Sequence, residues 1–184
     1  TSSGVGKAFY LSTAFPRNRG YIGRWDGKEL TQTTMSEFFN AVPASMFETH
    51  NKSMGYLKFK RAYGGSEIYY GDLKEARGLK NINLGWFWVD QAEEIDDERW
   101  NLLVSRLRKQ TVMYGPNNQP LRRADGSVII APTYGIATFN PEGTASYLYR
   151  FFHPDSPEKA AGYKLYQATT FDGMAAGFTT KEYV

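Results

Sequence analysis

The sequence predicts an open α/β fold, in which helices flank a mostly parallel sheet. Three observations support this prediction: an apolar run typical of a central strand, two segments with helical periodicity, and shorter strand-like segments that alternate with them. The chain has 184 residues, which is the length of one domain, and we expect a single domain over residues 1–184.

The central strand is predicted at Leu84–Val89, where Leu-Gly-Trp-Phe-Trp-Val is apolar on both faces. Such a run is expected of a parallel strand that helices cover on both sides. Helices are predicted at Met35–Val42 and Trp100–Leu107, because each has apolar residues at i, i+3, i+4 and i+7. Acidic residues begin the second helix and basic residues end it, which complements the helix dipole.

The other predicted strands are shorter and alternate with these helices. They are Tyr21–Trp25, Leu57–Phe59, Ile68–Tyr70, Ile136–Phe139 and Tyr163–Tyr166. A glycine turn joins the second and third of these, which predicts a hairpin.

Composition excludes several classes of protein. The chain has no cysteine, which excludes disulfides and thiolate metal sites, and only two histidines, which argues against a multi-histidine metal centre and a Ser-His-Asp triad. The net charge of +3 is compatible with nucleic-acid binding without proving it. No apolar run approaches the length of a membrane span and the first residues carry no secretory signal, so we expect a soluble, intracellular protein.

The first residues, Thr1–Ala8, partly match a phosphate-binding loop. Such a loop uses glycines so that backbone N–H groups can face the phosphates, a lysine that reaches them, and a Ser or Thr hydroxyl for magnesium. Gly4, Gly6 and Lys7 meet the first two requirements, whereas Ala8 stands where the hydroxyl is expected. A flexible, glycine-containing terminus explains this stretch equally well when it is taken alone.

Asp90 directly follows the apolar strand and is followed by Gln91, Ala92, Glu93 and Glu94. Ligands bind at the carboxyl ends of the strands in doubly wound sheets. A carboxylate there can hold magnesium, and a neighbouring acid can orient or deprotonate an attacking water. We favour this role for Asp90, whereas the two glutamates could equally begin a solvated helix, whose N-terminus favours acids.

A second strand end carries polar side chains. In Ile136–Pro141, Thr138 and Asn140 are expected to point to the same side, because side chains alternate along a strand. If this strand neighbours the one that ends at Asp90, both side chains would face the γ-phosphate of a nucleotide. An Asn-Pro turn that closes a strand is the more common local explanation.

In their order along the chain, these motifs resemble the ATPase motor domain of the large terminase subunit of tailed bacteriophages, which packages DNA into the empty capsid. The resemblance spans essentially the whole chain, and its most specific parts are the block from Asp90 to Arg108 and the Thr-Phe-Asn-Pro motif. The matching segments are Gly4–Lys7, Pro16–Arg24, Arg77–Gly78, Asp90–Ile95, Arg106–Arg108, Thr138–Pro141 and Thr169–Gly173.

The resemblance implies a P-loop NTPase fold of the RecA/ASCE-like kind that binds ATP with Mg²⁺. It implies that Lys7 is the phosphate-loop lysine, that the backbone from Gly4 through Val5 and Gly6 to Ala8 surrounds the phosphates, and that Asp90 is the magnesium-associated acid. On this interpretation Lys7 and Asp90 meet around a single triphosphate.

The resemblance also implies roles for four further polar residues. Thr138 and Asn140 correspond to a coupling motif that relays nucleotide state to DNA movement. Arg77 is placed like the arginine that neighbouring motor subunits insert in trans to stabilise the phosphoryl-transfer transition state. Arg24 is a second candidate for that arginine, and a plain surface charge explains it equally well.

The sequence departs from the family at several positions. Gln91 stands where many members carry the water-activating glutamate, so either Glu93 or Glu94 takes that role or hydrolysis is impaired. Ala8 lacks the hydroxyl expected on magnesium, and Gly173 stands where Asn is common. The strand before the phosphate loop and the C-terminal nuclease domain have no counterpart, so we expect a fragment of a longer protein.

The partners implied by the resemblance are double-stranded viral DNA, the portal or procapsid and the small terminase subunit, with a homo-oligomeric ring as the assembly, no membrane, and the host cytoplasm as location. Two basic clusters could contact DNA phosphates. They are Lys58, Lys60 and Arg61, and Arg106, Arg108, Lys109, Arg122 and Arg123. The alternatives are a non-catalytic DNA- or capsid-binding module with a degenerate P-loop fold, and another, helicase-like P-loop ATPase.

Overall fold

A computed structural model describes residues 2–76, 79–159 and 161–167 of the chain. The chain divides into two compact units, Thr1–Pro141 and Glu142–Val184. The first unit contains a six-stranded sheet with its helices, and the described part of the second contains one helix, α5 (Tyr147–Phe152). Among the described residues, no helix has the length and apolar character needed to cross a bilayer.

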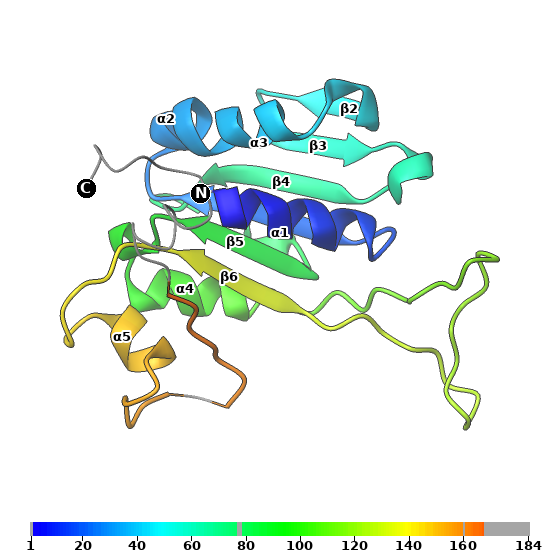
Figure 1. Ribbon diagram of the computed structural model, residues 1–184. Helices are drawn as coiled ribbons and strands as arrows, with labels where there is room; N and C mark the ends of the chain where they lie inside the picture. The colour runs from blue at the N-terminus through cyan, green and yellow to red at the C-terminus, as the bar shows by residue number, and fades with distance from the viewer. Residues whose placement is uncertain (1, 77–78, 160, 168–184) are drawn as a thin grey trace, which may run out of the picture. The chain divides into compact units, whose positions relative to one another are not determined.

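The sheet of the first unit is mostly parallel, as predicted (Figure 1). Its strands, in the order in which they lie side by side, are β2 (Phe47–Asn51), β3 (Tyr56–Phe59), β4 (Glu67–Asp72), β1 (Arg19–Arg24), β5 (Trp86–Asp90) and β6 (Tyr134–Thr138). β4, β1, β5 and β6 run parallel to one another, and β3 runs antiparallel to β2 and β4. The predicted hairpin is the β3–β4 pair.

Strand β5 is buried on both faces, as its apolar sequence predicts. Trp86 and Trp88 join the core that helices α1 (Ser2–Thr13) and α3 (Met35–Ala41) cover on one face. On the other face Phe87 contacts Trp100 of helix α4 (Asp97–Val104), with ring centroids 4.9 Å apart. Helices therefore cover the sheet on both faces, and all residues of its strand β5 are buried.

Two short elements follow β1 and lead into α3. Asp26 caps helix α2 (Gly27–Glu29) by accepting hydrogen bonds from the backbone N–H groups of Lys28 and Glu29. A π-helical turn, η1 (Leu30–Thr34), then joins α2 to α3. Such turns are rare and widen the helix by one residue, which changes the direction of the side chains that they carry.

Some predicted elements differ from the structure. The predicted helix over Trp100–Leu107 begins at a cap formed by Asp96 and ends at Val104. The predicted strand Tyr163–Tyr166 is wrong, because this segment has no regular structure and Tyr163 packs its ring on Phe152 of α5 instead, with centroids 5.0 Å apart. Helices α1 and α5 and strand β2 were not predicted at all.

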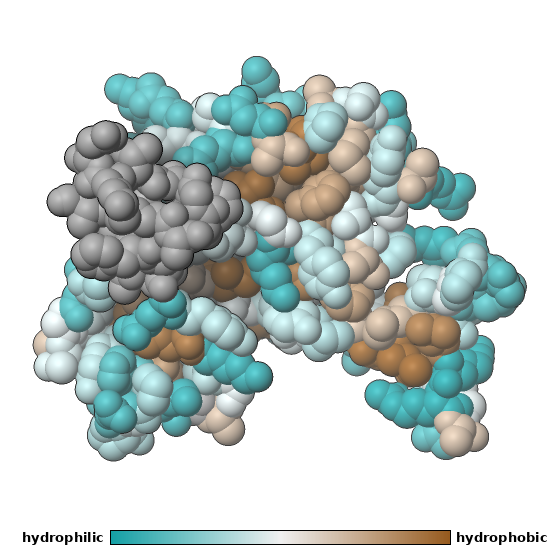
Figure 2. Space-filling view, in the orientation of Figure 1, coloured by the Kyte–Doolittle hydropathy of each residue, from teal (hydrophilic) through white to brown (hydrophobic). Residues whose placement is uncertain are grey.

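Residues 111–131 form an extended arm that precedes β6 and projects away from the sheet (Figure 1). Three isolated antiparallel bridges hold it together, Val112 to Ile130, Tyr114 to Pro120 and Arg122 to Val128. An apolar patch lies among polar side chains on its surface (Figure 2), and Leu121 is 37% exposed. The arm therefore has little core of its own.

Candidate functional site

The four parallel strands end together at one edge of the sheet, which we call the carboxyl edge. β1, β4, β5 and β6 end there at Arg24, Asp72, Asp90 and Thr138. The opposite edge, where these strands begin, is the amino edge. Ligands of open parallel sheets bind at the carboxyl edge.

Asp90 lies at the centre of the carboxyl edge and is only 2% exposed. Thr138, its partner in the parallel register of β5 and β6, donates a hydrogen bond from Oγ1 to Asp90 Oδ1 at 2.7 Å. The indole Nε1 of Trp88 donates in turn to Thr138 Oγ1 at 2.8 Å. The predicted neighbourhood of these two strand ends is therefore confirmed, and a chain of hydrogen bonds orients the carboxylate.

The second oxygen of Asp90 is held by a residue that sequence reasoning missed. Thr34 is fully buried and donates from Oγ1 to Asp90 Oδ2 at 2.6 Å. Thr34 is the last residue of the π-helical turn η1, which aims its hydroxyl at the strand end. The only hint in the sequence is the polar run Thr31–Thr34 in front of an otherwise apolar helix.

The loop after β5 is fastened to the loop after β6 by Asn140. The Asn140 side-chain amide donates to Glu93 Oε1 at 2.8 Å and to Gln91 Oε1 at 3.1 Å, and its backbone N–H donates to Glu93 Oε1 at 3.2 Å. Thr138 and Asn140 thus contact different carboxylates of the same edge. The other oxygen of Glu93, Oε2, is shielded from solvent and has no hydrogen-bond partner among the described residues.

Glu94 has a different environment from Glu93. Arg24 at the end of β1 binds it in a bidentate pair, from Nε to Oε2 at 3.1 Å and from Nη2 to Oε1 at 2.7 Å. The hydrogen bond with Glu94 raises the pKa of Arg24 above its ordinary value, against the opposing effect of burial. Arg24 also contacts Glu29 and Thr33, so it ties β1 to the turn that carries Thr34.

The predicted phosphate loop is wrong in its conformation, because Gly4, Val5, Gly6, Lys7 and Ala8 all lie within helix α1. In an α-helix the N–H of each residue bonds the carbonyl four residues earlier, so those from Gly6 onward cannot surround phosphates. Val5 and Ala8 instead face the core. Gly4 is required for packing, since a Cβ at this position would overlap the Trp88 ring.

Lys7 and Asp90 do not meet. The Lys7 ammonium lies 5.0 Å from the ring centroid of Tyr134, the first residue of β6. Thr138, which contacts Asp90, lies four residues further along that strand, or about 13 Å at the rise of a β-strand. Lys7 thus packs on the half of the sheet that points away from the carboxyl edge.

The remaining predicted site residues fall outside the described part of the chain. Arg77, the candidate trans-acting arginine, lies there with Gly78, and so does the motif Thr169–Gly173. Their roles stay predictions.

Asp90 and two of its neighbours offer oxygen atoms at this site: the Asp90 carboxylate and the hydroxyls of Thr34 and Thr138. Magnesium prefers oxygen ligands and is commonly held by one or two carboxylates, water and phosphate rather than by a full protein cage. No group of three or more His, Cys, Asp or Glu side chains with metal-binding geometry occurs in residues 2–76, 79–159 and 161–167. The residues present therefore fit a magnesium ion that a nucleotide brings with it.

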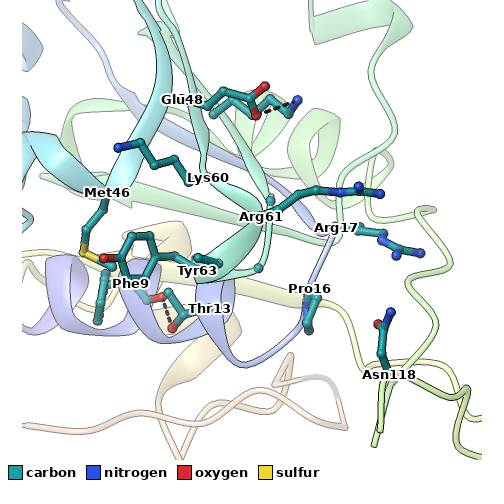
Figure 3. A pocket seen from close by; sticks show the side chains of 14 residues that line it. Phe9, Thr13, Pro16, Arg17, Met46, Glu48, Lys60, Arg61, Tyr63 and Asn118 are labelled. Carbon is teal, nitrogen blue, oxygen red and sulfur yellow. Dashed lines mark hydrogen bonds and ion pairs between the residues drawn. The ribbon is translucent and has the colours of Figure 1, made fainter. Parts of the chain in front are cut away.

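The amino edge carries a groove of about 1310 Å³ with basic walls (Figure 3). Arg17 precedes β1, and Lys58, Lys60 and Arg61 come from β3 and the turn after it. Lys58 is paired with Glu48 at 2.9 Å, whereas Lys60 and Arg61 form no ion pair with any described residue. We call these four residues and the space between them the basic groove; they include the first of the two predicted basic clusters.

No protein-family model matches the sequence, and no curated protein matches it. Among solved structures, the chain is similar to the large terminase of a thermophilic bacteriophage in complex with ADP, with a TM-score of 0.69 and 12% identity over 97% of this chain and 39% of that one. The same terminase in complex with ATP-gamma-S gives a TM-score of 0.64 at 13% identity, over 98% of this chain and 38% of that one. The large terminase ATPase domain of Thermus phage P74-26 gives 0.59 at 14% identity, over 95% of this chain and 73% of that domain.

The chain therefore has the fold of phage large-terminase ATPase domains, which is a P-loop NTPase fold. The predicted fold class is confirmed, and so is the resemblance drawn from the motifs, at the level of the fold. The chain spans between 31% and 39% of the terminase chains of the thermophilic bacteriophage that it matches.

Proposed function

We propose that this chain is the ATP-hydrolysing module of a DNA-packaging motor of the large-terminase type. The observation that carries the proposal is the buried Asp90 at the carboxyl edge, whose two oxygens are each oriented by a threonine hydroxyl. Two of the similar terminase structures contain ADP and ATP-gamma-S, which supports a nucleotide as the ligand of this fold.

The topology supports the same place for the nucleotide. After β1 the chain builds β2, β3 and β4 on one side of that strand, and then crosses over to build β5 and β6 on the other side. In doubly wound sheets the ligand crevice lies where the strand order reverses in this way. Arg24 and Asp90 are the last residues of the two strands that flank this point.

In this proposal the phosphates lie between Asp90 and the first turn of α1. The helix begins on the carboxyl side of the sheet, since Gly4 packs on Trp88, the residue whose indole bonds Thr138. The first N–H groups of a helix lack internal partners, and the helix dipole favours anions there. Asp90, with Thr34 and Thr138, would hold the magnesium ion, which neutralises charge that develops on the phosphates.

DNA translocation is the finer part of the proposal, and the basic groove is its candidate contact. Arg17, Lys60 and Arg61 face a groove on the edge opposite to Asp90, so a DNA backbone bound there would not compete with nucleotide. Arg122 and Arg123, on the exposed arm that leaves the same edge, add further positive charge. Portal, small terminase subunit and a ring of identical subunits remain proposed partners.

The test is the melting temperature of the intact protein with ATP and magnesium. A ligand that binds only the folded state stabilises it, by about 2.7 kcal/mol at a concentration of 100 times Kd. We expect ATP with magnesium to raise the melting temperature. Asp90→Asn should remove the magnesium-dependent part of the shift, because the amide offers a poorer ligand.

Lys7→Ala separates the present proposal from the loop that the sequence predicted. Since Lys7 packs on Tyr134 away from Asp90, this variant should keep the ATP-induced shift. No shift in the unmodified protein would contradict the proposal and favour the non-catalytic DNA- or capsid-binding module. A shift that depends on Lys7 but not on Asp90 would contradict the site.

A further inference from the structure

The loop after β5 offers two glutamates that could activate water, and their contacts differ. We propose that Glu93, and not Glu94, is the general base of the proposed hydrolysis, and that Asn140 is its positioning residue. This inference rests on the proposed function, and its experiments are chosen so that the two can fail separately.

Glu94 is unsuited to accept a proton. Both of its oxygens are engaged by Arg24 in a bidentate pair, at 3.1 and 2.7 Å. Charge-assisted pairs of this geometry are strong, so both oxygens of Glu94 are already committed to the guanidinium. To act as a base, Glu94 would have to give up the guanidinium that ties β1 to the turn after β5.

Glu93 has one oxygen held and one oxygen available. Oε1 accepts from both the side-chain amide and the backbone N–H of Asn140, at 2.8 and 3.2 Å. Oε2 is shielded from solvent and has no partner among the described residues. A buried acceptor without a partner is costly, so this atom is one that a bound water would satisfy.

The backbone explains why the base is three residues after Asp90 rather than next to it. Gln91 has φ 51° and ψ 56°, a left-handed conformation that is uncommon outside glycine and is enriched at functional sites. It ends β5 and starts the short 3-10 turn Ala92–Glu94, whose middle residue is Glu93. Asn140 also bonds the Gln91 side chain at 3.1 Å, which fixes this turn from the end of β6.

The proposed step is the hydrolysis of the γ-phosphate. The water oxygen forms a bond to the γ-phosphorus, and the bond from that phosphorus to the bridging oxygen breaks, with its electron pair leaving on ADP. One proton of the water passes to Glu93 Oε2, and from there to the released phosphate. General-base assistance of this kind contributes about 100- to 10,000-fold to a rate.

The first experiment compares Glu93→Gln with Glu94→Gln in the intact protein, by kcat, KM for ATP and the ATP-induced shift in melting temperature. Glu93→Gln should lower kcat about 100-fold or more and keep the shift, because it removes the base but no nucleotide contact. Glu94→Gln should lower kcat less than about tenfold and should reduce the melting temperature without ligand, because Arg24 loses one of its two carboxylate partners. The opposite ranking of the two kcat values would overturn the proposal.

The second experiment tests Asn140. Asn140→Ala should lower kcat with little change in KM, and Asn140→Asp should lower it further, because a second carboxylate repels Glu93. In the Glu93→Gln background, Asn140→Ala should cause no additional loss, since a positioning residue acts only through its base. Independent, multiplying losses would contradict this role.

The two proposals fail in different ways. If the unmodified protein shows no ATP-induced shift, the proposed function fails and the assignment of Glu93 fails with it. If the shift is present but Glu93→Gln hydrolyses ATP at the unmodified rate, only the assignment of Glu93 is wrong.

Discussion

At the carboxyl edge of the sheet, acidic side chains accept hydrogen bonds from threonine hydroxyls, Arg24 and Asn140, whereas at the amino edge long basic side chains line a groove. The carboxylates at the first edge are Asp26, Glu29, Asp72, Glu75, Asp90, Glu93 and Glu94. The cations at or leaving the second are Arg17, Lys58, Lys60, Arg61, Arg106, Arg108, Lys109, Arg122 and Arg123. Carboxylates are therefore in excess at one edge and cations at the other, although Arg24 lies at the first edge and Glu48 and Glu67 lie at the second.

The contacts of the two edges differ as much as their charge. At the carboxyl edge almost every polar group has a partner at short distance, as in the Thr34–Asp90–Thr138 set. At the amino edge Lys58 is paired with Glu48 and Arg17 donates a hydrogen bond to Tyr114, whereas Lys60 and Arg61 form no ion pair with any described residue. An ordered network of hydrogen bonds is suited to holding a reacting group in place. Cations without ion-pair partners are suited to binding the phosphate backbone of a nucleic acid, independently of its base sequence.

The largest expected effects, on ATP hydrolysis and on DNA binding, come from substituting residues at one edge at a time. Asp90→Asn should lower ATP hydrolysis by about 100-fold or more, because a magnesium ion held by Asp90 would supply several kcal/mol of charge stabilisation. Lys60→Glu with Arg61→Glu should leave the ATP-induced shift in melting temperature intact but weaken DNA binding, measured by fluorescence anisotropy. The slope of log K against log salt should fall by about two, one unit for each lost phosphate contact.

Each variant serves as the control for the other edge. DNA affinity that collapses in Asp90→Asn without nucleotide, or ATP binding that collapses in the charge-reversed variant, would show that the two edges are not separate sites. Unchanged DNA affinity in Lys60→Glu with Arg61→Glu would remove the basic groove from the proposal.

Helix α1 runs from one edge to the other and contains two glycines. Substituting each of them by alanine should change the free energy of unfolding, in opposite directions. Gly4→Ala should destabilise the protein by about 1–3 kcal/mol, because the added methyl group overlaps the Trp88 ring. Gly6→Ala should stabilise it by about 0.5–1 kcal/mol, since nothing lies within 4 Å of the added atom and alanine favours the helix. Urea unfolding of both variants measures the difference.

This pair also tests the conformation of the motif. If the segment were a phosphate loop, Gly6→Ala would weaken ATP binding instead of stabilising the protein. Equal effects of the two substitutions on the free energy of unfolding would contradict the packing of Gly4 on Trp88.

The smallest effect concerns pH at the amino edge. Burial, and then the charge of Arg19, lower the pKa of Lys109 below its ordinary value. As pH rises toward 10.5, Lys109 loses its proton in the folded state before it does so in the unfolded state. The contribution of Lys109 to the free energy of unfolding therefore rises with pH in that range. At neutral pH the charged lysine costs stability, so Lys109→Met should raise the melting temperature slightly.

The pH dependence distinguishes this cause from simple packing. The advantage of Lys109→Met over the unmodified protein should shrink as pH rises toward 10.5, and Arg108→Met should show no such trend. An advantage of Lys109→Met that stays constant with pH would show that the charge is not responsible. The comparison must be made between variants, because burial also raises the pKa of Tyr21 and so changes the stability of all of them at high pH.

Much of the fold could be predicted because its signals are local. Strand β5 is apolar on both faces and is buried on both faces, and α3 and α4 follow their apolar spacing. Helix α1 was missed, although Val5, Ala8 and Leu11 share one helical face, because Gly4 and Gly6 suggested a loop. The reason for Gly4 is the Trp88 ring, a contact between residues far apart in the sequence that no local pattern shows.

The site residues that lie at the ends of strands could be predicted from the sequence. Those that reach the site through turns could not. Asp90 and Thr138 were each singled out because they end predicted strands, and the two strands are parallel neighbours whose ends share a hydrogen bond. Thr34 reaches Asp90 through a π-helical turn, and Asn140 reaches Glu93 through the left-handed Gln91. Both depend on backbone geometry that is uncommon for the residues concerned, so the sequence alone gives little indication of it.

Trp88 gives the protein an optical property. Its ring packs against the first turn of α1, and its indole N–H bonds Thr138, which in turn bonds Asp90. One fluorophore therefore contacts both sides of the proposed nucleotide site. Indole emission is sensitive to the polarity and hydrogen bonding around the ring, so nucleotide binding there should change the tryptophan emission without an added dye.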